Sequence, residues 1–179
     1  MKRRLLLALP MVLASCTQDP VADYLGGFGS PLRGAILYAP RNLGDTSIYA
    51  GDPAGAAMAG AQLEFINRVV REDPIYAPRF GGDLLPGLQQ AVGEMRATIG
   101  ILAAAPGPFV EQSLRLAARQ LRSGDRAAAV NTLSDPRFYP AGGEATLARL
   151  ASLPKLRLVS ITAGQMAAEL DRLDRSRGR

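Results

Sequence analysis

The sequence contains no histidine and no tryptophan, and Cys16 is its only cysteine. Because histidine is the commonest general base and a frequent metal ligand, its absence excludes serine–histidine and cysteine–histidine catalytic pairs. Zinc-hydrolase motifs of the H-E-x-x-H kind are excluded for the same reason, and no Walker loop is present. A single cysteine also excludes an internal disulfide bond. The sequence therefore predicts no metal site and no bound cofactor.

The first sixteen residues have the composition of an export signal. A basic cluster over residues 2–4 precedes an apolar run over residues 5–13. The run is shorter than the about 20 apolar residues that a membrane-spanning helix needs, so a cleaved secretory signal is favoured. Leu13-Ala14-Ser15-Cys16 resembles the lipobox of bacterial lipoproteins, which consists of a leucine, two small residues and an obligatory cysteine.

The lipobox resemblance implies where the protein is processed and held. In this family, cleavage falls between the positions of Ser15 and Cys16, the thiol of Cys16 carries a diacylglycerol, and the freed amine is acylated as well, commonly with palmitate. Two or more acyl chains anchor a protein stably to a membrane. Enterobacterial lipoproteins with aspartate after the cysteine stay in the inner membrane, whereas Thr17 stands there in this chain. The resemblance therefore implies a cell-envelope protein, lipid-anchored in the outer membrane and facing the periplasm.

The expected domain organisation follows from this leader. We expect a signal peptide over residues 1–15, the lipidated Cys16 with a Gly- and Pro-rich flexible tether over residues 16–34, and a helical domain over residues 35–179. Once the three basic residues of the leader are removed, the 21 basic residues of the chain become 18, against 16 acidic ones. That balance is too weak to predict a nucleic-acid partner.

Alanine- and leucine-rich segments with helical periodicity fill the predicted domain. Asp52-Pro53 and Asp73-Pro74 mark the start and the end of one helix. An apolar stripe recurs at steps of four and three residues from Leu88 to Leu102, which predicts a helix over residues 84–104. The sequence thus favours a mainly α fold, a compact bundle of five or six helices after the tether. Residues 35–38 fit a short extended segment. Further helices are predicted over residues 110–121, 126–133, 144–153 and 159–175.

Two polar patterns are weak candidates for catalysis. Ser152 and Lys155 fit the S-x-x-K motif of penicillin-binding enzymes, but Pro154 stands between them and no K-T-G motif follows. Glu64 and Glu94 are the candidates for a carboxylate-based hydrolase, because two carboxyl groups suffice to cleave a glycan. Both glutamates are nevertheless predicted to lie on solvated helix faces.

A row of arginines lies on and directly after the helix predicted over residues 110–121. Arg115, Arg119 and Arg122 would form a ridge on a continuous helix, and Arg126 follows the next turn. Because the chain is rich in arginine, we interpret this ridge as a solvated helix face. The alternative is a contact with anionic lipid headgroups or with an acidic partner.

Tyrosine and arginine recur together in the predicted loops. Residues 38–45 and 76–83 are identical at six of eight positions, and residues 135–143 have a similar composition. Tyrosine rings stack on sugars and peptides, and arginine forks bind carboxylates. In the alternative reading, each tyrosine covers a helix end and each arginine satisfies loop carbonyls. The candidate binding-loop residues are Tyr38, Arg41, Tyr76, Arg79, Arg137 and Tyr139.

These observations lead to an expected role and to two alternatives. The favoured one is a membrane-anchored, non-enzymatic envelope lipoprotein that serves as an adaptor or accessory subunit and docks a protein partner. The first alternative is a module that binds peptidoglycan, either its glycan or its peptide, through the tyrosine and arginine loops. The least favoured is the carboxylate-based hydrolase.

Overall fold

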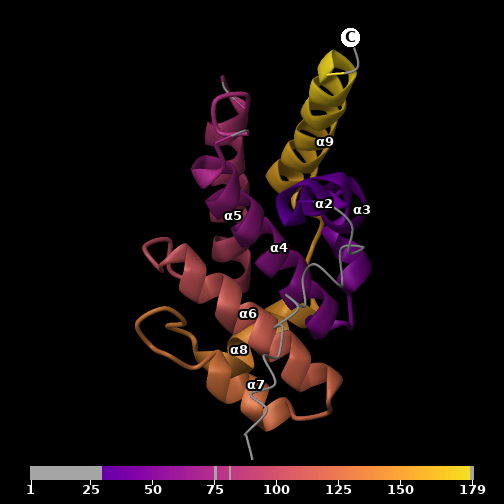
Figure 1. The fold of residues 1–179 in the computed structure, drawn as a ribbon. Coiled ribbons are helices and arrows are strands. Elements are labelled where there is room, and N and C mark those ends of the chain that lie inside the picture. The colour runs from indigo at the N-terminus through magenta and orange to yellow at the C-terminus, as the bar shows by residue number, and fades with distance from the viewer. Residues whose placement is uncertain (1–29, 75, 81, 178–179) are drawn as a thin grey trace, which may run out of the picture.

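The structure, a computed structural model, describes residues 30–74, 76–80 and 82–177 (Figure 1). Within these residues the chain forms eight α-helices, one short 3-10 helix and no strand, so the predicted mainly α bundle is confirmed with more helices than the five or six expected. The elements are α2 (Pro31–Leu37), α3 (Ala39–Leu43), η1 (Thr46–Tyr49), α4 (Pro53–Glu72), α5 (Leu84–Ile99), α6 (Gly107–Arg122), α7 (Arg126–Thr132), α8 (Gly142–Ala151) and α9 (Arg157–Arg177).

The additional helices lie at the start of the described chain. The sequence predicted a tether up to residue 34 and an extended segment at 35–38, and both predictions are wrong for the described part of that region, because α2 begins at Pro31. Proline is favoured in the first turn of a helix, where its missing N–H is not needed. Leu32 is 1% exposed and Ile36 is fully buried, so packing overrides the Gly- and Pro-rich composition.

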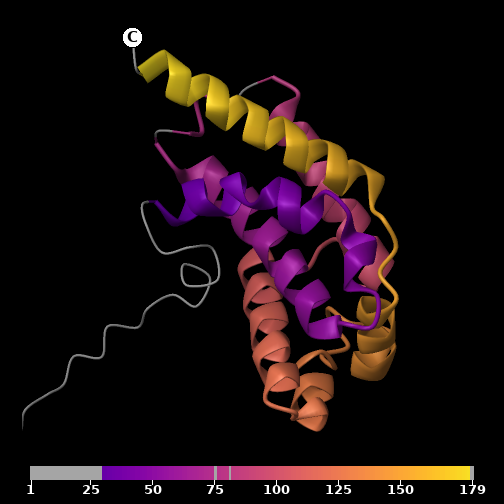
Figure 2. The same cartoon turned by 90° about the vertical axis from the view of Figure 1, so that its right-hand side faces the viewer.

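Helix α4 runs through the middle of the molecule (Figures 1 and 2). It begins where the sequence predicted, because the side chain of Asp52 accepts a hydrogen bond from the backbone N–H of Gly55 at 2.9 Å. Every residue from Ala54 to Ile66 is buried, which small side chains permit by letting neighbouring helices approach from several sides. Its most extensive contact is with α6, and it also packs against α2, α5 and α8.

Helices α5 and α9 lie antiparallel beside each other. The C-terminal part of α5 meets the start of α9, since Glu94 accepts hydrogen bonds from the backbone N–H groups of Arg157, Leu158 and Val159 at 2.8–3.1 Å. Nearer the other end, the Thr162 hydroxyl donates to the carbonyl of Gly87 at 3.3 Å. Glu94 therefore caps a helix that begins 63 residues further along the chain.

The predicted end of α5 at residue 104 needs correction. The helix stops at Ile99, and Gly100 follows with φ of 83°, a left-handed conformation that glycine adopts without strain. The backbone N–H of Leu102 then bonds to the carbonyl of Phe138 at 3.0 Å, which holds the segment after the helix against a distant loop.

Helices α6, α7 and α8 form the end of the molecule that lies away from the C-terminus of α9 (Figure 2). The predicted turn between α6 and α7 is confirmed. Gly124 has φ of 81°, and the Asp125 side chain caps α7 by accepting from the N–H of Ala128 at 2.9 Å. Both features are typical of a tight connection between antiparallel helices.

Candidate functional site

A buried ion pair links the two central helices. Glu64 of α4 and Arg96 of α5 are 3% and 7% exposed. Their side chains make two hydrogen bonds, from Nε to Oε1 at 2.6 Å and from Nη2 to Oε2 at 2.8 Å. Nη1 of Arg96 also donates to the carbonyls of Ala103 and Ala105 at 2.9 and 2.8 Å. The pair satisfies the rule that buried charges persist when they are paired and hydrogen-bonded.

The burial of Glu64 contradicts the solvated helix face that the sequence predicted. Glu64 follows Leu63 on a helix that is covered on several sides, so its face is enclosed although it lies off the main apolar stripe. Arg96 was not among the candidate residues predicted from the sequence. Its only sequence signal is its place four residues after Val92, on the flank of the apolar stripe of α5.

A second charged group adjoins this region at the α4–α6 contact. Glu111 is 6% exposed and accepts from Nε and Nη2 of Arg68, both at 3.1 Å. Arg115 lies 2.7 Å from the other carboxylate oxygen. The guanidinium carbons of Arg68 and Arg115 lie 5.7 and 5.5 Å from the centroid of the Phe65 ring, within cation–π range.

The predicted arginine ridge is therefore only partly present. Arg115 belongs to the buried contact with Glu111, and its side chain is 13% exposed. Arg126 forms an ion pair with Glu144 of α8. Arg119 and Arg122 are exposed on α6, as the solvated-face reading predicted.

A surface cavity of about 440 Å³ lies between α4 and α5, and Arg96 forms part of its lining. We call it the α4–α5 cavity. Arg71 reaches across it from α4, donating to the carbonyl of Leu85 at 3.2 Å and to the side-chain oxygen of Asn67 at 3.3 Å. The cavity is lined by Asn67, Arg71, Gln89, Val92, Gly93, Arg96 and Ala103.

A second concave region, the α5–α9 groove, consists of two cavities of about 470 and 310 Å³ that share Asp83 and Gln165. Ile161 is 44% exposed on the α9 side. The larger cavity is lined by Arg79, Gly82, Asp83, Leu84, Gln165 and Glu169. The smaller one is lined by Asp83, Pro86, Gly87, Gln90, Leu158, Ile161, Thr162 and Gln165.

The structure does not expose two of the tyrosines predicted to bind ligands. Tyr76 is 5% exposed and stacks on Phe80 with ring centroids 5.5 Å apart. Tyr139 is fully buried, its hydroxyl shares a hydrogen bond with Ser113, and burial raises its pKa above the usual value of 10.0. Neither ring can stack on a ligand in this conformation. Both tyrosines belong to the hydrophobic core.

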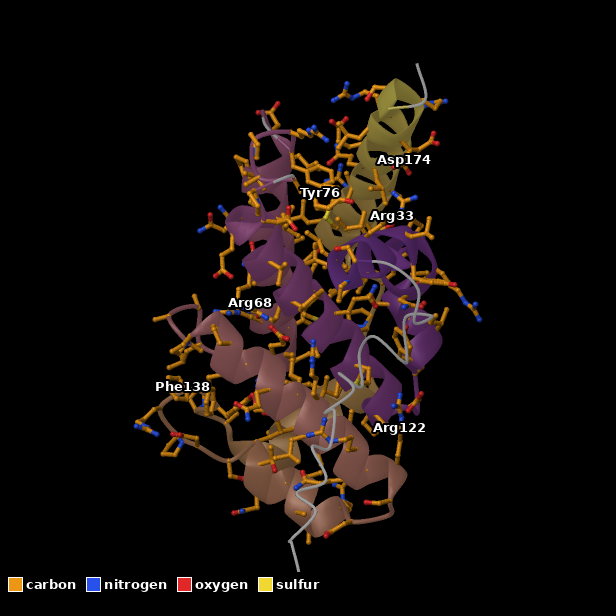
Figure 3. The ribbon with its side chains drawn as sticks, viewed as in Figure 1. Arg33, Arg68, Tyr76, Arg122, Phe138 and Asp174 are labelled. Carbon is orange, nitrogen blue, oxygen red and sulfur yellow. The ribbon has the colours of Figure 1, made fainter. Side chains whose placement is uncertain are left out.

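The remaining loop residues do not gather into one surface. Tyr38 is 37% exposed and Arg41 is exposed on α3. The exposed Arg137 forms an ion pair with Asp135 at 2.7 Å and holds the pKa of that carboxyl below its usual range. In Figure 3, Tyr76 lies near α9, whereas Phe138, the neighbour of Arg137, lies at the far end of the molecule. Of the six candidates, only Arg79 lines one of the cavities described above.

The catalytic candidates are engaged in structural contacts. Glu94 caps α9, as described. The Ser152 hydroxyl donates to the carbonyl of Ala148 at 2.9 Å, and the Lys155 amine lies 3.8 Å from Asp45, so the S-x-x-K residues have separate partners. The lipobox residues Ser15 and Cys16 lie outside the described residues.

No protein-family model, curated protein or solved structure matches the chain. In the part of the chain that the structure describes, none of the helices is both long and apolar enough to cross a membrane. The described residues also contain no group of three or more cysteine, aspartate or glutamate side chains placed to hold a metal ion.

Proposed function

We propose that this protein is a lipid-anchored envelope lipoprotein that acts as a non-enzymatic adaptor and docks a protein partner in the α5–α9 groove. The anchor is inferred from the lipobox residues Leu13-Ala14-Ser15-Cys16. The groove supports the docking role, because it combines the exposed side chain of Ile161 with the polar side chains of Gln90 and Gln165. An apolar centre within a polar rim is typical of protein interfaces.

The positions of the glutamates support the adaptor over the hydrolase. A glycosidase needs one carboxyl group that holds a proton and a second that is free to act as base or nucleophile. Glu64 is bound at both oxygens by Arg96, and Glu94 accepts three backbone N–H groups at the start of α9. Both groups are therefore committed to holding helices together.

The cell-wall-binding alternative receives no such support. It depends on exposed tyrosine rings close to arginines, and the rings of Tyr76 and Tyr139 are buried in different parts of the core. Removing Tyr76 would alter packing before it altered a binding surface. Wall binding is therefore not part of the proposed function.

The anchor is tested by labelling and by mass. Cells grown with an alkyne analogue of palmitate should label the native chain and should not label a Cys16→Ser variant. Intact-mass analysis should find a chain that starts at Cys16 and carries added acyl mass. A native chain that retains residues 1–15 and has no added acyl groups would contradict the proposal.

The docking role is tested with a matched pair of variants. A photo-crosslinking amino acid placed at Gln165 should give one discrete protein adduct in intact cells. The Ile161→Asp substitution puts a charge in the groove, which should weaken binding of the partner. A loss of about 1.4 kcal/mol of binding free energy makes a complex tenfold weaker. We therefore expect the adduct to fall at least about tenfold. The control is Leu116→Asp on α6, whose side chain is similarly exposed at 38% against 44% for Ile161. Equal adduct yields in the two variants would refute docking in the groove.

A further inference from the structure

The lining of the α4–α5 cavity presents hydrogen-bond donors and lacks carboxylates. Its polar side chains are two arginines and two amides, Arg71, Arg96, Asn67 and Gln89. Within the part of the chain that the structure describes, Arg71 has no carboxylate partner. Its hydrogen bonds to Leu85 and Asn67 use Nε and Nη2, which leaves the two N–H groups of Nη1.

The two arginines have different roles in this cavity. Arg96 is neutralised by Glu64, so it contributes a fixed wall rather than a net charge. The neighbouring Glu72 is turned to Arg68, with which it forms an ion pair at 3.6 Å. The net charge of the lining is therefore the positive charge of Arg71, held at the edge of the cavity by its contact with the Leu85 carbonyl. A cation held in place by other bonds loses little entropy when it binds a ligand.

Gly93 is a further indication of a ligand. It lies inside α5, where glycine is less favourable than alanine. Close contact with a neighbouring helix does not account for it, because no atom outside the helix lies within 4 Å of the place that a Cβ of Gly93 would occupy. Gly93 instead lines the α4–α5 cavity, where a larger side chain would take up space.

We infer that the α4–α5 cavity binds the carboxylate of a small organic acid or of a peptide C-terminus. Arg71 supplies the positive charge through its Nη1 edge, and the amides of Asn67 and Gln89 supply further hydrogen bonds. A volume of about 440 Å³ is within the range of small-molecule sites. A guanidinium suits a carboxylate, because its hydrogen bonds to the negatively charged oxygens are charge-assisted and stronger than those between neutral groups. This inference does not depend on the lipid anchor or on the α5–α9 groove.

Isothermal titration calorimetry of the full chain in matched detergent buffer tests the site. The probes are succinate, N-acetyl-dialanine, and the same dipeptide with its C-terminus amidated. We expect saturable binding of at least one carboxylate and no binding of the amide. Binding of succinate alone assigns the site to free organic acids, and binding of the dipeptide alone assigns it to chain ends. Inorganic phosphate is titrated as a further probe. Failure of both carboxylates to bind, equal binding of the amidated dipeptide, or equal binding of inorganic phosphate overturns the inference.

Variants then locate the binding in this cavity. Arg71→Gln removes the positive charge and its charge-assisted hydrogen bonds, so it should weaken carboxylate binding by at least about tenfold, while Arg119→Gln on α6 should not. Gly93→Leu should abolish binding by filling the cavity. Its control is Gly164→Leu, because Gly164 is also an exposed helical glycine with no atom outside its helix within 4 Å of an added Cβ. Circular dichroism spectra of each variant confirm folding. Unchanged affinity in folded Arg71→Gln or Gly93→Leu would refute the site.

Discussion

Replacing Arg96 by methionine tests whether the buried ion pair holds the centre of the fold together. Methionine keeps an apolar stem of similar length, so the change removes charge and hydrogen bonds more than volume. The variant loses both bonds to Glu64 and both bonds to the carbonyls of Ala103 and Ala105. Glu64, at 3% exposure, is left as a buried carboxylate without this partner.

The expected loss is large. Removing one partner of a buried ion pair costs about 3–5 kcal/mol, because the other charge stays uncompensated. For a domain of this size, about 2–4 °C of melting temperature corresponds to each kcal/mol, so Arg96→Met should lower the melting temperature by about 6–20 °C. Removing both charges in Glu64→Leu/Arg96→Met should restore about 2 kcal/mol of this stability. The remaining cost comes chiefly from the buried bond to the Ala105 carbonyl and is about 1–3 kcal/mol.

Urea unfolding followed by far-UV circular dichroism measures these differences. Arg126→Met is the control, because Arg126 pairs with Glu144 while 59% of its side chain is exposed, and exposed pairs contribute at most about 1 kcal/mol. If Arg96→Met cost no more than this control, the ion pair would not stabilise the core. Additivity is the second test. If the double variant lost as much unfolding free energy as Glu64→Leu and Arg96→Met lose together, an uncompensated buried charge would not explain the loss in Arg96→Met.

Three further predictions follow from single contacts. Glu94→Ala removes the cap of α9, so the free energy of unfolding should fall by about 0.5–2 kcal/mol, as read from the urea midpoint. Tyr139→Phe should cost about 1 kcal/mol at neutral pH, because the buried hydrogen bond between the hydroxyls of Tyr139 and Ser113 is lost. Burial raises the pKa of Tyr139, so the stability linked to its neutral form is complete below about pH 10 and is lost as pH rises through the folded-state pKa. The decline of unfolding free energy above about pH 10 should therefore be shallower in Tyr139→Phe. Gly100→Ala should destabilise by more than about 1 kcal/mol, because the φ of +83° is a left-handed conformation that strains a residue with a Cβ.

Each of these predictions has a control in the same chain. Glu144→Ala removes an exposed carboxylate and should change the urea midpoint little. A similar shift in Glu94→Ala would argue against the cap. Gly164→Ala should stabilise the protein by up to about 1 kcal/mol, in contrast to Gly100→Ala, because its place in α9 is open. Identical alkaline declines in the native chain and in Tyr139→Phe would show that another group controls them.

Helix ends with strong local signals were predictable. Asp52 caps α4 at the residue that the sequence indicated, because an N-cap needs only a side-chain oxygen and a nearby N–H. The repeated octapeptide shows the limit of such signals. Residues 38–45 contain the helix α3, whereas the described residues between 76 and 80 form turns. Six identical positions do not determine the conformation, because neighbours from distant helices decide it.

The candidate sites were predictable only in small part. The sequence drew attention to Glu64 and Arg79, but it placed Glu64 in solvent and grouped Arg79 with tyrosines that are buried in the structure. Burial of a charge depends on which helices cover it, and that information is tertiary. Arg96 pairs with a residue 32 positions away, a separation at which no local rule applies.

The contacts of α9 have a consequence for synthesis of the protein. This last helix packs against α2, α3 and α5, and Arg33 in the first described turn bonds to Asp174, 141 residues later, at 2.7 Å (Figure 3). A growing chain therefore lacks part of the cover for its earliest helices until translation is almost finished. Contacts between such distant residues also slow folding. A premature stop codon before residue 157 would release a product with those helices uncovered, which chaperones and proteases would meet as an incomplete domain.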